Sequence, residues 1–436
     1  MNRIKTLLLN EPIKNFLKVF SSGVFAQGLS FVLAPVFSRL FTPDDFGLLA
    51  LYLSIFSILS VFSTGKYEQA IMLPKENKDA INIFALVIII TAAVSLFLTA
   101  ITPFFIYYTK EIFANNKIAP WLWFIPLSVL MHGIVQGLTF WYNRNKKFGT
   151  IAQSTLFNYI PLNSAKLVTG FAKTPFNGLI LSNIIGMFSI TVFLTVRFFK
   201  SIPYLFANTT LKDIRKNAKI YSVYPKYNMI HTFTNNFSGT LPVFLFTWGF
   251  SSEAAGLYSF GHVFVFKPLN IISNSILQVL SQKTIEDFNK GINILPNIKK
   301  MIKVLFNVGI LPFIVLFFFA PEIFDFLFSS NYREAGVYLQ ILTPWLFMVF
   351  LTSSLSFIPE MYFRQKTAMF IDIIYFILRF LALAIGVYYS NIKLSLILFS
   401  AVNFVIISIK LIWYIKLSKT SLNLKSHTET DNISES

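Results

Sequence analysis

Two basic side chains, Lys267 and Arg379, interrupt long apolar stretches of this sequence. A cation at the centre of a bilayer costs roughly 2.5–3.5 kcal/mol on an insertion scale, so a chain that keeps one there usually gives it a wet cavity. No acidic residue lies in the apolar stretch around Lys267, which favours an anionic substrate group as its partner. Arg379 can instead pair with Asp372, two turns away on the same helical face, so for Arg379 both readings stay open.

Amide side chains form a second set of candidates within the apolar stretches. They recur three or four residues apart, a spacing that places them on one face of a helix. Polar groups within a membrane span face the bundle interior or a water-filled cavity by default. Hydrogen bonds between helices, worth about 0.6–2 kcal/mol each, are the alternative role. The predicted substrate-binding residues are therefore Lys267, Arg379, Asn235, Asn228, Asn270, Asn274 and Gln27.

Signatures of catalysis are missing from the sequence. The four histidines are scattered, there is no cysteine, and no zinc-protease, serine-hydrolase or P-loop motif occurs. The sequence thus predicts no catalytic residue, no metal site, no cofactor and no ATP hydrolysis. We expect a protein that is not an enzyme.

The elements that must position these side chains are membrane helices. Of 436 residues, 55% are hydrophobic and 13% are charged, whereas soluble domains have about 25% charged residues. Each helical span needs about 20 apolar residues. The sequence predicts an all-α polytopic membrane protein with about 12 transmembrane helices, at 17–38, 46–64, 81–107, 119–142, 151–172, 176–198, 227–249, 255–281, 302–320, 335–358, 367–388 and 392–415.

The net charge of +18 follows the expected topology. With both termini on one side, that side carries 28 Lys and Arg residues and the other carries 7. Cytoplasmic loops are enriched in basic residues, so both termini are predicted to be cytoplasmic. The surplus charge then faces anionic lipid headgroups, and it gives no reason to expect a nucleic-acid partner.

A long basic loop divides the predicted helices into two six-helix lobes around a central cavity. We expect an N-terminal lobe over 1–200 with an amphipathic N-terminus, a cytoplasmic inter-lobe loop over 201–226, a C-terminal lobe over 227–417 and a disordered cytoplasmic tail over 418–436. A weak internal repeat supports the division, because two similar segments occupy matching places in the halves, Pro35-Val36-Phe37 before Gly47-Leu48 and Pro242-Val243-Phe244 before Gly256-Leu257. Repeated lobes are typical of transporters that alternate access to a central site.

Several segments of the chain carry a recognisable family pattern. The segment around Arg39 to Pro74 reads SRLFTPDDFGLLALYLSIFSILSVFSTGKYEQAIMLPK, and GLTFWYNRNKKFGTIA and SSNYREAGVYLQILTPWLF follow in order. The sequence resembles the bacterial polysaccharide-export flippases, the O-antigen (Wzx-type) translocases of the multidrug, oligosaccharidyl-lipid and polysaccharide exporter superfamily. The resemblance extends over most of the chain.

This resemblance implies a flippase of the bacterial inner membrane that works by alternating access. Its cargo would be an undecaprenyl-pyrophosphate-linked oligosaccharide, carried from the cytoplasmic to the periplasmic leaflet and driven by an ion gradient. Membrane lipids, a glycan polymerase and chain-length machinery would be its partners. Arg39 and Glu68 belong to the family pattern near helix ends, and with Asp372, the one acidic residue placed within a span, they are the expected gating or coupling residues.

Two alternatives stay open at this point. A drug or cation antiporter of the same superfamily should carry more carboxylates than cations in its cavity, and here Lys267 and Arg379 meet only Asp372. A membrane glycan polymerase should have a sizeable external loop. The longest external segments here are roughly 10–15 residues, which disfavours that enzyme.

Overall fold

The computed structural model describes residues 11–112, 117–201 and 209–419. The side chains of residues 11–20, 110–112 and 201, and of several residues between 270 and 283, are outside that description. The expected amphipathic N-terminus and the expected tail therefore lie largely outside the described residues.

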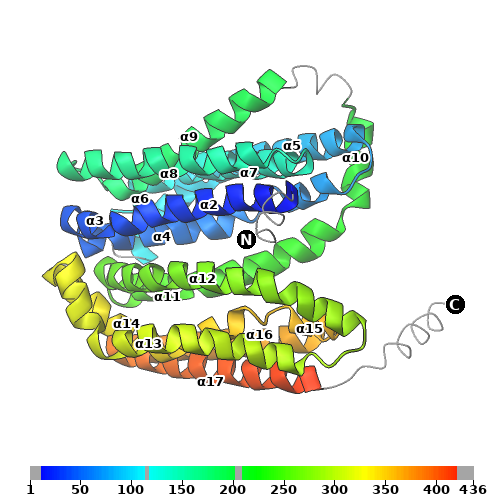
Figure 1. The fold of residues 1–436 in the computed structure, drawn as a ribbon. Coiled ribbons are helices and arrows are strands. Elements are labelled where there is room, and N and C mark those ends of the chain that lie inside the picture. Colours follow the sequence, from blue (N-terminus) through cyan, green and yellow to red (C-terminus); the bar gives the residue numbers. More distant parts are fainter. Residues whose placement is uncertain (1–10, 113–116, 202–208, 420–436) are drawn as a thin grey trace. The chain divides into compact units, whose positions relative to one another are not determined.

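Helices account for the architecture of the described residues, which contain no strand (Figure 1). Every one of the expected apolar ranges coincides with a helix or a closely spaced helix pair. The prediction of an all-α membrane protein is confirmed. The expected ranges correspond to α2 (Glu11–Val32) with α3 (Ala34–Leu40), α4 (Pro43–Ser60), α5 (Asn77–Ile112), α6 (Ala119–Leu122) with α7 (Ile125–Arg144), α8 (Phe148–Phe171), α9 (Gly178–Ser201), α11 (Met229–Gly249), α12 (Ser252–Asn289), α13 (Leu295–Phe328), α14 (Arg333–Ser353) with α15 (Ile358–Met361), α16 (Gln365–Tyr388) and α17 (Ile392–Lys419).

Among the described residues, eight helices are long and apolar enough to cross a membrane. A ninth is obtained if α2 and α3, which meet at a bend of 41°, form one span. Of the remaining expected spans, α8 and α11 carry polar residues such as Lys166 and Asn235 and are not among these helices. Several residues of α12 lie outside the described side chains, so its span is not tested. The count of 12 therefore stays a prediction.

Helix ends follow local sequence signals. Thr42 caps α4, because its hydroxyl accepts a hydrogen bond from the Asp45 backbone N–H while the Asp45 carboxylate accepts one from the Thr42 N–H at 2.9 Å. Pro43 at the first helical position has no N–H to leave unpaired there. Pro35, the second residue of α3, likewise has no N–H to leave unpaired in the first turn, where the chain bends.

The chain forms two compact units, residues 1–259 and 260–436, and the boundary falls inside α12. In the first unit α8 packs on α9 and α2, and α5 packs on α7 (Figure 1). A buried core at one end of these helices is built from large apolar and aromatic side chains, among them Phe84, Trp141 and Phe198. The expected lobe boundaries, at 200 and 227, stay a prediction.

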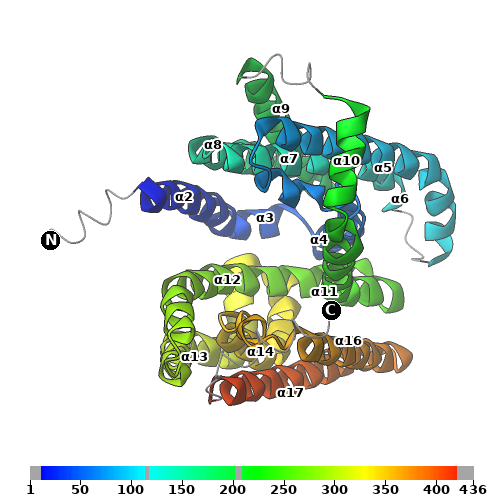
Figure 2. The same cartoon turned by 90° about the vertical axis from the view of Figure 1, so that its right-hand side faces the viewer.

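The second unit is built around α13, α14 and α17, which pack on one another (Figure 2). Its buried core includes Met301, Leu355 and Tyr414. Outward-facing surfaces of α13 and α16 carry exposed large apolar side chains such as Leu311 and Phe326. In a helix of this length and hydropathy such side chains are suited to contact lipid.

Two glycines allow the N-terminal ends of α4 and α12 to cross in backbone contact within the first unit. A Cβ atom on Gly47 would lie 1.7 Å from the carbonyl oxygen of Ser252, and one on Gly256 would lie 1.9 Å from that of Pro43. No side chain fits at either position, so glycine is required by the close approach of the two helices. These are the two glycines of the internal repeat.

Ion pairs join helix ends that were expected on the same side of the membrane. Lys117 Nζ lies 2.6 Å from Asp44 Oδ2, and this carboxylate raises the pKa of Lys117. On the opposite, basic side, helix α10 (Leu211–Ile220) docks on the start of α5 through Lys78 Nζ, which lies 3.0 Å from Asp213 Oδ2. The side of the membrane on which each pair lies stays a prediction.

Candidate substrate site

Arg379 lies in an aromatic enclosure of the second unit. Its guanidinium carbon is 5.0 Å from the ring centres of both Tyr375 and Phe399, and the residue is only 8% exposed. A cation over aromatic faces is stabilised by about 2 kcal/mol or more when it is shielded from water. The enclosure therefore supplies part of what water would otherwise give this buried charge.

Neighbouring polar and aromatic groups extend this enclosure. Tyr375 donates a hydrogen bond to the Asn403 side-chain oxygen, which links α16 to α17. On α14, Trp345 packs edge-on against Phe399 with ring centres 5.2 Å apart, and it stacks on His262 at 5.7 Å. One buried cation, an amide, a phenol and an imidazole thus gather among aromatic rings from four helices.

Asp372, expected as a coupling residue and as a possible partner of Arg379, forms its ion pair with Lys410. Their charged atoms, Oδ1 and Nζ, are 2.5 Å apart. The Lys410 side chain is 14% exposed and that of Asp372 is 54% exposed. The pair joins α16 to α17 and gives Asp372 a structural contact that the sequence interpretation did not find.

Lys267 lies on α12 with an exposed side chain, and it forms no ion pair among the described residues. Its charge therefore has no carboxylate partner among the described residues. Asn270 and Asn274 lie on the same helix, but their side chains are outside the described ones. The proposed Lys–Asn face is therefore represented by Lys267 alone.

The candidate amides of the first unit have different roles. The Asn228 amide donates to the Gln69 side-chain oxygen at 2.9 Å, a contact between the start of α11 and the 3₁₀ helix η1 (Tyr67–Met72). Asn235 is exposed and Gln27 is half-buried. Asn236, which sequence reasoning passed over, holds α11 to α4 by donating to the Ser57 carbonyl at 2.9 Å. Asn235 is the most accessible of the three candidates.

Glu68 is the most deeply buried acidic residue among these candidates. It is 3% exposed, and its Oε1 atom lies 3.8 Å from Lys66 Nζ. Its Oε2 atom has no hydrogen-bond partner among the described residues. Lys66 has a positive φ of 63° and follows Gly65 at 56°, so a left-handed turn brings the cation to the carboxylate. A buried carboxylate oxygen without a partner can still accept a hydrogen bond or bind a cation.

Arg39, the remaining gating candidate, is exposed at the end of α3. Its guanidinium donates to the Pro35 carbonyl at 2.7 Å, one turn earlier in the same helix. The contact satisfies a backbone oxygen beside a proline-containing turn and fits a helix-end role.

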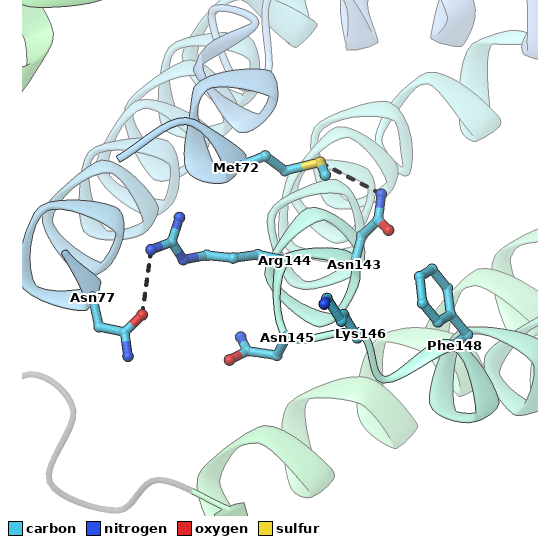
Figure 3. Close-up of a pocket in the computed structure, with 7 residues that line it drawn as sticks. All are labelled: Met72, Asn77, Asn143, Arg144, Asn145, Lys146 and Phe148. Atoms are coloured by element: carbon cyan, nitrogen blue, oxygen red, sulfur yellow. Dashed lines mark hydrogen bonds between the residues drawn. The ribbon is translucent and has the colours of Figure 1, made fainter. Parts of the chain in front are cut away.

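A cavity of about 420 Å³ lies at the basic end of the first unit, lined by residues from the η1–α5 turn and the α7–α8 corner (Figure 3). Arg144 points across it toward Asn77 and donates to the Pro74 carbonyl at 2.7 Å and to Asn77 Oδ1 at 3.3 Å. The corner belongs to one of the family-like segments, yet none of the predicted site residues lies here. The sequence signal was the Asn-Arg-Asn-Lys-Lys run itself.

Comparison with known families assigns the chain. The family described as "polysaccharide biosynthesis protein" matches residues 36–336, more than half of the sequence. The chain belongs to this family. None of the curated proteins compared with the chain matches it.

Solved structures share the fold of the family member described here. An inward-facing multidrug resistance MATE transporter of the MOP superfamily is 13% identical, with a TM-score of 0.67 and coverage of 94% of this chain and 96% of that one. The lipid II flippase MurJ in an inward closed conformation is 16% identical, with a TM-score of 0.66 and coverage of 91% and 87%. An outward-facing MATE transporter is 12% identical, with a TM-score of 0.56 and coverage of 95% and 98%. The fold is that of MOP-superfamily transporters, as the sequence resemblance implied.

Proposed function

We propose that this protein flips an undecaprenyl-pyrophosphate-linked oligosaccharide from the cytoplasmic to the periplasmic leaflet of the bacterial inner membrane. The observation that carries the proposal is the family match over residues 36–336 in a chain with a transporter fold. A structural neighbour whose name states lipid II as its cargo supports a lipid-linked substrate. The proposed oligosaccharide is a repeat unit of an O-antigen, a capsule or an exopolysaccharide.

The physical task explains why the chain keeps polar side chains in its helices. A glycan and a pyrophosphate cannot cross hydrocarbon unaided, whereas a prenyl tail can stay in lipid. The protein must offer polar partners to the head of the substrate, including a cation for the pyrophosphate. Lys267, which is exposed and has no ion-pair partner among the described residues, is the proposed first contact. Arg379 is the second, with its charge held in the aromatic enclosure.

An ion gradient is the proposed source of energy, because the sequence has no nucleotide-binding loop. Glu68 is the proposed coupling residue of the first unit, since its carboxylate is buried against a single cation at 3.8 Å. Asp372 is a weaker candidate because Lys410 holds it at 2.5 Å. Binding of a proton or cation at Glu68 would weaken its attraction to Lys66, which links the ion to the turn before η1.

The proposed orientation has both termini in the cytoplasm, with the basic loops toward anionic lipid. The expected two-lobe division and a central cavity belong to the same proposal, and so do a glycan polymerase and chain-length machinery as partners. None of these partners needs a catalytic group on this chain, in keeping with its transporter fold.

Reconstitution tests the function directly. The protein is placed in vesicles whose inner leaflet holds the lipid-linked oligosaccharide, and a glycosidase added outside reports how much substrate reaches the outer leaflet. We expect cleavage above that of empty vesicles, stimulated by an imposed proton or sodium gradient, with Lys267→Ala slower and the exposed Lys299→Ala unchanged. If vesicles with the protein show no more cleavage than empty vesicles but actively extrude a cationic dye, the protein is an antiporter and not a flippase.

A further inference from the structure

The cavity at the α7–α8 corner has the chemistry of an anion site. The cavity has a volume of about 420 Å³, and its lining includes two basic residues, Arg144 and Lys146 (Figure 3). Three amides and two apolar side chains complete the lining, which has no carboxylate. The other lining residues are Met72, Asn77, Asn143, Asn145 and Phe148. Within the part of the chain that is described, neither basic residue forms an ion pair.

Arg144 is fixed in place by backbone oxygens. It donates to the carbonyls of Ile71 at 3.2 Å and Pro74 at 2.7 Å, and more loosely to that of Glu76 at 3.4 Å. Carbonyls orient a guanidinium but leave its net positive charge in place. The exposed Glu76 enters through its backbone only. Arg144 therefore gives the cavity a rigid positive wall.

Lys146 and Asn143 are the groups that can reach a ligand. Lys146 is exposed and has a positive φ of 54°, and its side chain lines the cavity whereas that of the adjacent Lys147 does not. Within the described parts of the chain, the side-chain amide of Asn143 donates to the Met72 sulfur, at 3.5 Å. Sulfur is a weak acceptor, so a phosphate oxygen would be a stronger partner for this amide.

The cavity lies at the ends of two candidate membrane spans, a position where a phospholipid headgroup can be reached. It is bounded by the first turn of α5 and the last turn of α7, two helices apolar enough to span a membrane. Met72, 43% exposed, and the neighbouring Leu73, 56% exposed, provide an apolar border for the start of an acyl chain. An occupant with a phosphate and an adjoining hydrocarbon segment fits both features.

We propose that this cavity binds the phosphate of an anionic lipid headgroup, held by Lys146 and Asn143 against the fixed charge of Arg144. The shared chemistry is a phosphate anion, and inorganic pyrophosphate is the other source of it. The site lies within one unit and needs no transport, so its occupancy is measurable whether or not the protein is a flippase. Binding there would brace the corner that joins α7 to α8 against the η1–α5 turn.

Lipid binding to the purified full chain tests the proposal. Retention of phosphatidylglycerol and of phosphatidylcholine is measured by native mass spectrometry for the wild type, Lys146→Gln and the neighbouring control Lys147→Gln. We expect phosphatidylglycerol to be preferred, and its affinity to fall about tenfold in Lys146→Gln with little change in Lys147→Gln, since a charge-assisted hydrogen bond is lost. Asn143→Asp, which keeps the size of the side chain and adds a negative charge, should lower the affinity as well.

The outcomes separate the possible ligands. If millimolar inorganic pyrophosphate does not displace phosphatidylglycerol, the occupant is a lipid headgroup. If pyrophosphate displaces it, the lipid is overturned as the occupant in favour of a free anion. Equal retention in Lys146→Gln and Lys147→Gln overturns the site itself. Thermal unfolding of each variant is recorded alongside, and unchanged midpoints are expected because Lys146 is exposed.

Discussion

Replacing Gly47 by alanine tests the backbone crossing of α4 and α12. The added Cβ would lie 1.7 Å from the Ser252 carbonyl oxygen, and ordinary contact begins at 3.4 Å, so the helices must separate by about 1.7 Å. Overpacking of a fixed site costs roughly 1–3 kcal/mol, and the upper end applies because a backbone atom cannot rotate away. We expect Gly47→Ala to lower the free energy of unfolding by about 3 kcal/mol.

Gly239→Ala is the matched control for this substitution. Gly239 lies inside α11, and a Cβ there meets nothing within 4 Å. It should stabilise the protein by about 0.5–1 kcal/mol through helix propensity alone. Reversible unfolding in mixed micelles, followed by tryptophan fluorescence, measures both. Equal stability of the Gly47 and Gly239 variants would refute the crossing.

The reciprocal change makes the test sharper. Gly256→Ala alone should be costly, because its Cβ would lie 1.9 Å from the Pro43 carbonyl oxygen. In a chain that already carries Gly47→Ala the helices are apart, so the second substitution should cost less than it does alone. Strictly additive losses would mean that the two glycines do not share one contact.

Three further changes probe contacts on the basic side. Lys66→Met leaves the Glu68 carboxylate buried without its cation, and it should lower the free energy of unfolding by about 2 kcal/mol. This is below the 3–5 kcal/mol of a fully buried pair because Lys66 is partly exposed. Adding Glu68→Gln should restore much of the stability in the same unfolding assay. Arg144→Ala removes the donors that hold the turn before α5, and it should lower the free energy of unfolding by about 2–3 kcal/mol. Arg144→Lys should have an intermediate effect. Faster hydrogen exchange over 71–77 is the measurement that checks this. The hydrogen bond from Lys78 is the largest cause that lowers the pKa of Asp213 from 3.8, so this contact stabilises the docked α10 above that pH and is lost as the pH falls further. Proteolysis of 209–226 should then accelerate. Lys78→Gln should weaken this pH dependence, and the Thr210 hydrogen bond should retain part of it.

Helix positions could be predicted from the sequence because each is set locally. Apolar runs place α16 within two residues of its observed start, and the Thr42 cap and Pro43 explain why α4 begins earlier than hydropathy alone indicates. Polar residues that interrupt the apolar run of α8 are also visible in the sequence. They explain why this helix is not apolar enough to count as a membrane span. Periodicity and capping need no knowledge of tertiary partners.

Side-chain partners could not be predicted in the same way, since they come from distant segments. Asp372 pairs with Lys410, a residue 38 positions away on another helix, and nothing within its own helix indicated this. Arg379 is flanked by Phe399 from that same neighbouring helix. The cavity beside Arg144 depends on how the η1–α5 turn meets the α7–α8 corner, and the basic run alone did not specify that arrangement.

The polar character of α8 and α11 has a consequence for biogenesis. On insertion scales a leucine at the centre of a helix gains only about 0.3–0.6 kcal/mol, whereas one lysine there costs about 2.5–3.5 kcal/mol. Lys166 lies five residues before the end of α8, where this cost is smaller, and it still offsets part of the gain from its apolar neighbours. Helix α9, made immediately afterwards, packs on α8 and passes the hydropathy test, so the two are suited to leave the translocon as a hairpin. Helix α11 packs on α4, which is synthesised long before α11. The insertion of α11 into the membrane therefore depends on a helix that is already inserted.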